Sequence, residues 1–89
     1  MLLLRGVIFM TVGQAVAQRI EALCREHDIS INKLCTISGV TQSTVNNIVS
    51  GRNNSATVAT VKKLCDGLGI TIETFFADPL FRDLEQEIK

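Results

Sequence analysis

The 89-residue chain contains a single proline, Pro79, and that proline lies near the C-terminus. Proline interrupts helices because it lacks a backbone N–H donor and its ring collides with the preceding turn, so almost the whole chain before Pro79 is free to form helices. Aromatic residues amount to only 4%, all of them Phe, which disfavours a β-sheet. A chain of this length forms one domain. The sequence therefore predicts a single all-α domain.

Ser and Thr residues mark the starts of the predicted helices, because their side chains cap the free N–H groups of a first turn. Thr11 and Gln14 have the spacing of a capping box and begin a helix that runs to about Glu26. Four further N-cap residues begin a second, third, fourth and fifth helix: Ser30, Thr41, Thr57 and Thr71. Glycines follow three of these helices, in the positions typical of helix ends: Gly39, Gly51 and Gly69.

The two ends of the chain differ from this central domain, which we place at residues 11–77. Asp78 followed by Pro79 is typical of a helix start, so we expect an acidic C-terminal helix over residues 78–89. Its apolar stripe would consist of Leu80, Phe81, Leu84 and Ile88. Residues 1–10 form an apolar N-terminal arm, interpreted either as a strand or as a segment that precedes a native start at Met10.

Three features bear on location and on bound groups. The apolar arm is shorter than the roughly 20 residues that cross a bilayer, and it lacks the features of a signal peptide, so we expect a cytoplasmic protein without membrane contact. Three widely spaced cysteines, Cys24, Cys35 and Cys65, lie on apolar helix faces and are interpreted as core residues. No Cys/His spacing typical of zinc and no catalytic grouping is present. We therefore expect no enzyme activity, no metal, no cofactor and no small-molecule ligand.

The formal net charge is zero, but the charges are unevenly distributed. Seven basic and three acidic residues give residues 1–63 a net charge of +4, whereas two basic and six acidic residues give residues 64–89 a net charge of −4. No acidic residue lies between Ile29 and Lys63. This distribution indicates that a polyanion would contact the middle of the chain.

Residues 31–50 have the pattern of two short helices joined by a tight turn. The turn contains Gly39, and the small residue Cys35 lies where the helices would cross. Apolar residues at the inner positions leave one face of the third helix exposed, with Gln42, Ser43, Thr44, Asn46 and Asn47. Amide and hydroxyl groups can bond to base edges in the major groove. Because most of these residues are poor helix formers, we interpret them as a DNA-reading face rather than as a merely solvated surface.

This pattern resembles the lambda-repressor-like, Cro/Xre-type helix-turn-helix family. The resemblance extends over about residues 12–77, and it is most specific in residues 34–45, 48–52 and 64–71. It implies a five-helix lambda-repressor-like fold and a transcriptional regulator, usually a repressor that binds a pseudo-palindromic operator in double-stranded DNA as a homodimer. Two departures are Ser38, where an apolar residue is common in the family, and the neutral net charge, which lowers the expected affinity.

The resemblance also implies roles for individual residues. Base readout would fall to Gln42, Ser43 and Asn47. Contacts with phosphates, or secondary contacts with bases, would fall to Lys33, Thr41, Thr44, Asn46 and Arg52. For the homodimer we favour the N-terminal arm as part of the interface, with the C-terminal apolar stripe as the competing surface. An alternative interpretation keeps the fold and makes the chain an antitoxin-like module that binds another protein.

Overall fold

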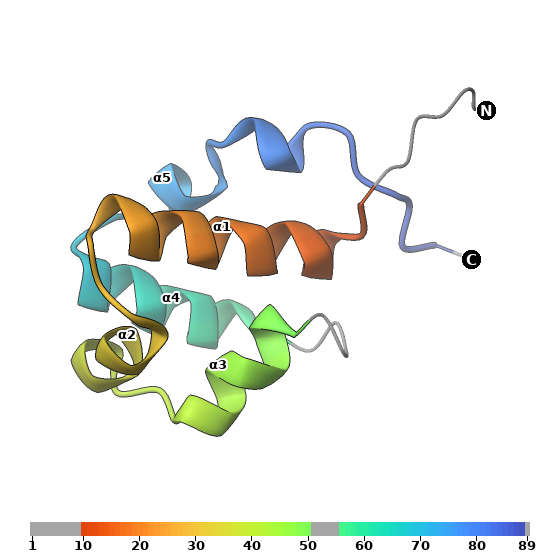
Figure 1. Ribbon diagram of the computed structural model, residues 1–89. Coiled ribbons are helices and arrows are strands. Elements are labelled where there is room, and N and C mark those ends of the chain that lie inside the picture. Colours follow the sequence, from red (N-terminus) through yellow and green to blue (C-terminus); the bar gives the residue numbers. More distant parts are fainter. Residues whose placement is uncertain (1–9, 51–55, 89) are drawn as a thin grey trace.

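The computed structural model in Figure 1 describes residues 10–50 and 56–88. It is helical, with α1 running across the centre, α5 on one side of it and α2, α3 and α4 on the other. The elements are α1 (Val12–Glu26), α2 (Ile31–Ser38), α3 (Gln42–Val49), α4 (Val58–Leu68), α5 (Ile72–Phe76) and a 3-10 turn, η1 (Pro79–Phe81). Within the described residues, no helix combines the length and the apolar character needed to cross a membrane.

The five predicted helix starts are confirmed, because the side chain of each predicted N-cap residue accepts a backbone hydrogen bond from its first turn. The capping box of α1 is complete: Gln14 N donates to Thr11 Oγ1 at 3.1 Å, and Thr11 N donates to Gln14 Oε1 at 3.0 Å. In α3, α4 and α5 the capping threonine also contacts the hydroxyl of a threonine three residues later. Local sequence therefore sets where each helix begins.

Two of the predicted glycine helix ends are confirmed. Gly39 and Gly69 have φ angles of 71° and 72°, in the left-handed region that glycine adopts without strain. The end of α1 also has a residue in the left-handed conformation, but here the residue is an aspartate. Asp28 has a φ of 55°, and Ile29 N donates to Cys24 O at 2.9 Å. Aspartate tolerates this conformation better than most residues. The third glycine, Gly51, lies outside the described residues.

The core is built from the inner faces of α1 to α5. Ile20, Leu34, Val45, Leu64 and Phe75 are each at most 1% exposed. All three cysteines are buried in this core as free thiols, so the prediction that they serve as core residues is confirmed. Burial raises the pKa of the Cys24 and Cys65 thiols. Both thiols therefore stay protonated and unreactive at neutral pH.

The prediction of a C-terminal helix over residues 78–89 is wrong. Only Pro79–Phe81 forms a single 3-10 turn, and beyond it Leu84 makes an isolated parallel bridge with Met10. Glu85 N donates to Met10 O at 2.9 Å in this bridge. A continued helix would place two acidic side chains in its last turn, where the helix dipole disfavours negative charge: Glu85 and Glu87.

The apolar side chains of this segment are used by the domain itself. Phe81 packs against the core and meets Phe76 with ring centroids 4.8 Å apart. Leu80 and Leu84 are half-buried, and only Ile88 is fully exposed, at 88%. The predicted competing dimer surface is therefore largely covered. The predicted strand in the arm concerns residues 1–9, which lie outside the described residues, and it stays a prediction.

Arg19 of α1 is the one buried charged residue among the described residues, and it is only 7% exposed. Its guanidinium donates to Phe75 O at 2.8 Å, to Thr74 O at 3.1 Å and to the Asp78 carboxylate at 3.3 Å. Glu26 lies 3.8 Å away but is largely solvent-exposed, so it adds little. The two carbonyls belong to the C-terminal end of α5, where Thr74 O also accepts from Ala77 N at 3.3 Å. Arg19 therefore joins α5 and the C-terminal segment to α1.

Gly67 of α4 packs closely against Ser38 of α2. A Cβ at position 67 would lie 3.0 Å from both Ser38 Cα and Ser38 Cβ and 3.1 Å from Ile37 O, which is tighter than most Cβ contacts in proteins, so α2 would have to shift by a few tenths of an ångström. The two helices therefore approach at a point where each carries a very small residue. The Ser38 hydroxyl is satisfied within its own helix, because it donates to Leu34 O at 2.6 Å.

Replacing Arg19 should destabilise the fold. Arg19→Met removes the side-chain donor to Phe75 O and one donor each to Thr74 O and the Asp78 carboxylate, and we expect a loss of about 2–4 kcal/mol in the free energy of unfolding. Urea denaturation measures this change. Arg25→Met, on the exposed face of the same helix, is the matched control and should cost less than about 0.5 kcal/mol. Equal losses in the two variants would contradict the role given to Arg19.

Gly67→Ala should also destabilise the fold, by about 1–3 kcal/mol, because the added methyl group meets backbone atoms that cannot rotate away. This loss would occur although alanine favours helix formation by up to about 1 kcal/mol over glycine. The reverse substitution on the exposed side of α4, Ala59→Gly, reports that intrinsic preference in the same urea experiment. A gain in stability for Gly67→Ala would show that α2 and α4 can separate at no cost.

Candidate nucleic-acid interface

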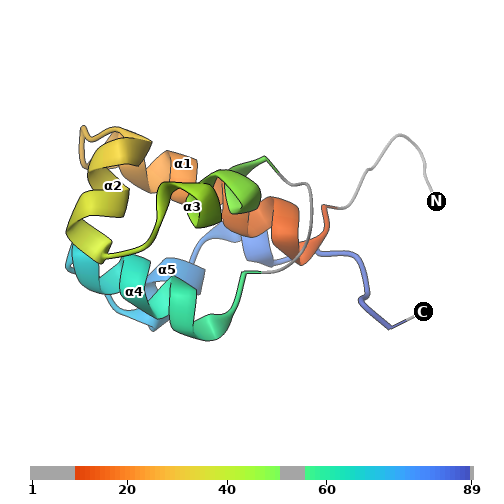
Figure 2. The same cartoon turned by 90° about the horizontal axis from the view of Figure 1, so that it is seen from below.

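The relative positions of α2 and α3 are set by their buried faces. Leu34 and Cys35 anchor α2, Val45 and Ile48 anchor α3, and Val40 is buried in the turn between them. Gly39 takes its left-handed conformation at the start of this turn. Figure 2 shows α2 and α3 running in different directions on the same side of the domain. The predicted helix-turn-helix unit is therefore present, and α3 is fixed by its inner face.

The outer face of α3 is polar and uncharged. Gln42, Ser43, Asn46 and Asn47 are exposed, as expected from the sequence. Within the described part of the chain, their side-chain amide and hydroxyl groups form no hydrogen bond with other protein groups. Residues four apart lie above one another on a helix, so these four side chains form one continuous stripe. Their donors and acceptors are free for a ligand.

The two threonines at the start of α3 are already engaged. Thr44 N donates to Thr41 Oγ1 at 3.2 Å, and the two hydroxyl oxygens lie 2.8 Å apart. Thr41 is exposed, whereas Thr44 is half-buried. Both residues therefore stabilise the first turn of α3, and this structural role exists alongside any contact with phosphate.

Some of the seven basic side chains counted in residues 1–63 are engaged by acidic groups of the domain itself. Lys33 is exposed in the first turn of α2, whose start Ser30 caps. Arg52 lies outside the described residues, so its position is not tested. Arg19 is buried in contact with Asp78, and Lys62 forms an ion pair with Asp66. Two of the seven basic residues counted in residues 1–63 are therefore paired with acidic residues from the C-terminal part.

The burial of Arg19 was not predicted from the sequence, although the position of Arg19 among the apolar residues of α1 indicates it. Arg19 follows Val16 by three residues and precedes Leu23 by four, so it lies on the apolar stripe of α1. A charge in such a stripe points to a buried partner rather than to solvent.

In the described residues, no group of three or more His, Cys, Asp or Glu side chains could hold a metal ion.

Comparison with known proteins agrees with this geometry. Residues 19–79 match the family model of the Cro/C1-type HTH DNA-binding domain. The chain is 32% identical over 60 residues to the HTH-type transcriptional repressor RghR of Bacillus subtilis (strain 168). This match spans 67% of the chain but only 44% of the length of RghR.

Two solved structures have the same fold. The crystal structure of the prophage Lp1 protein 11 superposes with a TM-score of 0.76 at 33% identity, over 85% of this chain and 100% of that chain. A crystal structure of an HTH_3 family transcriptional regulator from Vibrio cholerae has a TM-score of 0.69 at 25% identity, over 76% of this chain and 38% of that chain.

The family match includes α2, α3, α4 and α5 in full, together with the second half of α1. The all-α, lambda-repressor-like fold expected from the sequence is confirmed. The family consists of DNA-binding regulators rather than enzymes, in agreement with the expectation that the chain is not an enzyme. The protein therefore belongs to the Cro/C1-type helix-turn-helix family of DNA-binding transcriptional regulators.

Proposed function

We propose that the protein is a repressor that binds a pseudo-palindromic operator as a homodimer, with α3 in the major groove. The observation that carries this proposal is the free stripe of amide and hydroxyl groups on α3, opposite the buried Val45 and Ile48. A relative that is itself named a transcriptional repressor supports the direction of regulation. Repression would follow from occupation of the operator, which blocks access of the polymerase.

Base readout is assigned to Gln42, Ser43 and Asn47. Gln and Asn side chains can bond bidentately to N6 and N7 of adenine, and Ser is short enough to approach a base edge closely. Gln42 and Ser43 lie in the first turn of α3, the end that enters the groove in this type of motif. Asn47 lies one turn after Ser43 on the same face and would reach a neighbouring base pair.

Contacts with the DNA backbone are assigned to Lys33, Thr41, Thr44, Asn46 and Arg52. Only Lys33 and Arg52 in this set carry a charge. Each DNA phosphate that a Lys or Arg of the protein neutralises makes the affinity for DNA fall more steeply as the salt concentration rises. We therefore expect a shallow salt dependence, with specificity that depends mainly on the uncharged face of α3.

A dimer follows from the small size of the interface. One helix-turn-helix unit contacts only a few base pairs, and a second copy on the other half of the operator doubles the information read. Two such units bind successive major grooves when their reading helices lie about 34 Å apart, one turn of the duplex. This spacing is the geometric requirement that any proposed dimer interface has to meet.

Substitutions on α3 test base readout. Once a cognate site has been selected from random DNA, Gln42→Ala and Asn47→Ala should each cost about 1–3 kcal/mol on that site and relax the preference at one base pair. Fluorescence anisotropy with a panel of single-base operator variants measures both effects. Gln18→Ala, an exposed position on α1, is the control. Full affinity and unchanged preference in both α3 variants would show that another element reads the bases.

Substitutions of the two cations test backbone contact. Lys33→Ala and Arg52→Ala should weaken binding to all sequences alike and reduce the slope of log affinity against log salt by about one unit per protomer. Titrations from low to physiological salt measure the slope. Lys62→Ala is the matched control because Lys62 lies on α4 and pairs with Asp66. A loss restricted to one base pair would reassign that residue to base readout.

A further inference from the structure

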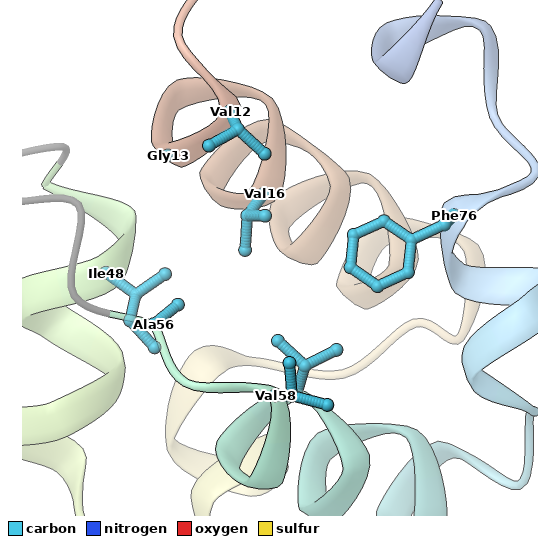
Figure 3. Close-up of a pocket in the computed structure, with 8 residues that line it drawn as sticks. Val12, Gly13, Val16, Ile48, Ala56, Val58 and Phe76 are labelled. Atoms are coloured by element: carbon cyan, nitrogen blue, oxygen red, sulfur yellow. The ribbon is translucent and has the colours of Figure 1, made fainter. Parts of the chain in front are cut away.

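The rotation of α3 about its own axis is fixed by apolar contacts. Figure 3 shows the side chains of Ile48, Val16 and Val58, from three different helices, pointing into an apolar pocket whose lining contains no charged residue. Phe76 of α5 lies at the mouth of this pocket and is 38% exposed. Val45, three residues before Ile48 in α3, is fully buried. Because Val45 and Ile48 both face inward, the fold determines which residues of α3 face outward.

Polar side chains occupy the outward direction. Successive residues of a helix are rotated by about 100°, so Ser43, Asn46 and Asn47 lie within about 50° of the direction opposite to the two inner side chains. Gln42 lies about 90° from that direction, in the first turn. All four side chains are exposed. Within the described part of the chain, none of them forms a hydrogen bond with another protein group, so their donors and acceptors are free.

Charged side chains are absent from this face. The sequence of α3 contains no Lys, Arg, Asp or Glu, and residues 29–63 contain no acidic residue. In the major groove, guanine is most often read by a bidentate Arg or Lys, and cytosine by an Asp or Glu that accepts from N4. Lys33, the one charged residue of α2, belongs to the helix that crosses the DNA backbone in this type of motif. The outward face of α3 therefore lacks the usual partners of a G·C pair.

The chemistry of the amide group favours adenine over the other bases. A Gln or Asn amide presents one acceptor beside one donor group, and adenine presents the matching donor at N6 and acceptor at N7. Guanine presents two acceptors, O6 and N7, so the amide oxygen would face an acceptor without a proton between them. Leaving a desolvated polar group unpaired is costly. Three exposed amides on one helix, those of Gln42, Asn46 and Asn47, therefore disfavour G·C pairs.

We propose that the operator half-site beneath α3 is a run of A·T base pairs, with adenines bound by Gln42 and Asn47. This inference rests on the proposed function, in which α3 enters the major groove, and it adds the base composition of the site. Gln42 and Asn47 are five residues apart, about 7.5 Å along the helix axis, which corresponds to about two base-pair steps. The Ser43 hydroxyl between them both donates and accepts, so it tolerates either base of an A·T pair. The run therefore comprises about three pairs.

Selection from random duplex DNA with the full chain tests the base composition. The selection is repeated with Gln42→Ala and Asn47→Ala, and the positions at which these variants lose the wild-type preference should be A·T pairs. Replacing either pair with G·C should weaken wild-type binding about 5- to 150-fold. Gln18→Ala, at an exposed position of α1, is the control and should select the wild-type site.

A base analogue tests the contacted atom. The analogue 7-deazaadenine lacks the N7 acceptor but keeps Watson–Crick pairing and the minor-groove edge. At the adenine assigned to Gln42 it should weaken wild-type binding about fivefold or more. It should not weaken binding of Gln42→Ala further, because that variant has already lost the contact. Lys33→Ala is the matched control: its binding is weaker on every sequence, and the analogue should reduce it by the same factor as in the wild type.

The outcomes separate this inference from the proposed function. If the positions whose preference the α3 variants lose are G·C pairs, the run of A·T pairs is overturned and base readout by α3 stands. A·T pairs that tolerate 7-deazaadenine in the wild type would overturn the contact with adenine. Unchanged selection in both α3 variants would overturn base readout by α3 together with this inference. Binding of the wild type to DNA without any selected sequence would overturn the proposed function itself.

Discussion

The buried guanidinium of Arg19 is the interaction on which the arrangement of the C-terminal half depends. A charge that is only 7% exposed needs partners, and Arg19 finds them in two carbonyls at the end of α5 and in Asp78. These bonds hold α5 against α1, and the same position of α5 places Phe75 in the core and Phe76 at the mouth of the apolar pocket. One electrostatic contact therefore positions both a core residue and a surface residue.

The pairing of charges within the domain changes how a neutral chain contacts DNA. Arg19 and Lys62 are each paired with an acidic residue from the C-terminal part, so they contribute little to a cationic surface. The face of α3 contains no charge at all. Affinity from released counterions is correspondingly limited, and under the proposed function discrimination between sequences would depend on hydrogen bonds from the α3 face. In the proposed dimer, a second copy on the operator would compensate for the weak contact of one protomer.

The close approach of α2 and α4 connects the fold to this face. Ser38 and Gly67 are both small, and each leaves space for the backbone of the other helix. Since α2 is joined to α3 by the short turn at Gly39 and Val40, the position of α2 on α4 also sets the position of α3. The residues of this contact lie outside the exposed face of α3 but help to determine where that face is held.

Local sequence determined the helices, because caps such as Thr41 and left-handed glycines such as Gly39 act within one turn of chain, and apolar spacing identifies the face that packs inward. It also determined which side chains of α3 are exposed, since Val45 and Ile48 had to be buried. Tertiary structure alone decided the partners of Arg19, because Thr74, Phe75 and Asp78 lie more than fifty residues away. It also decided that the C-terminal segment pairs with Met10 instead of forming a helix. These contacts depend on where distant segments meet, and local spacing carries no information about that.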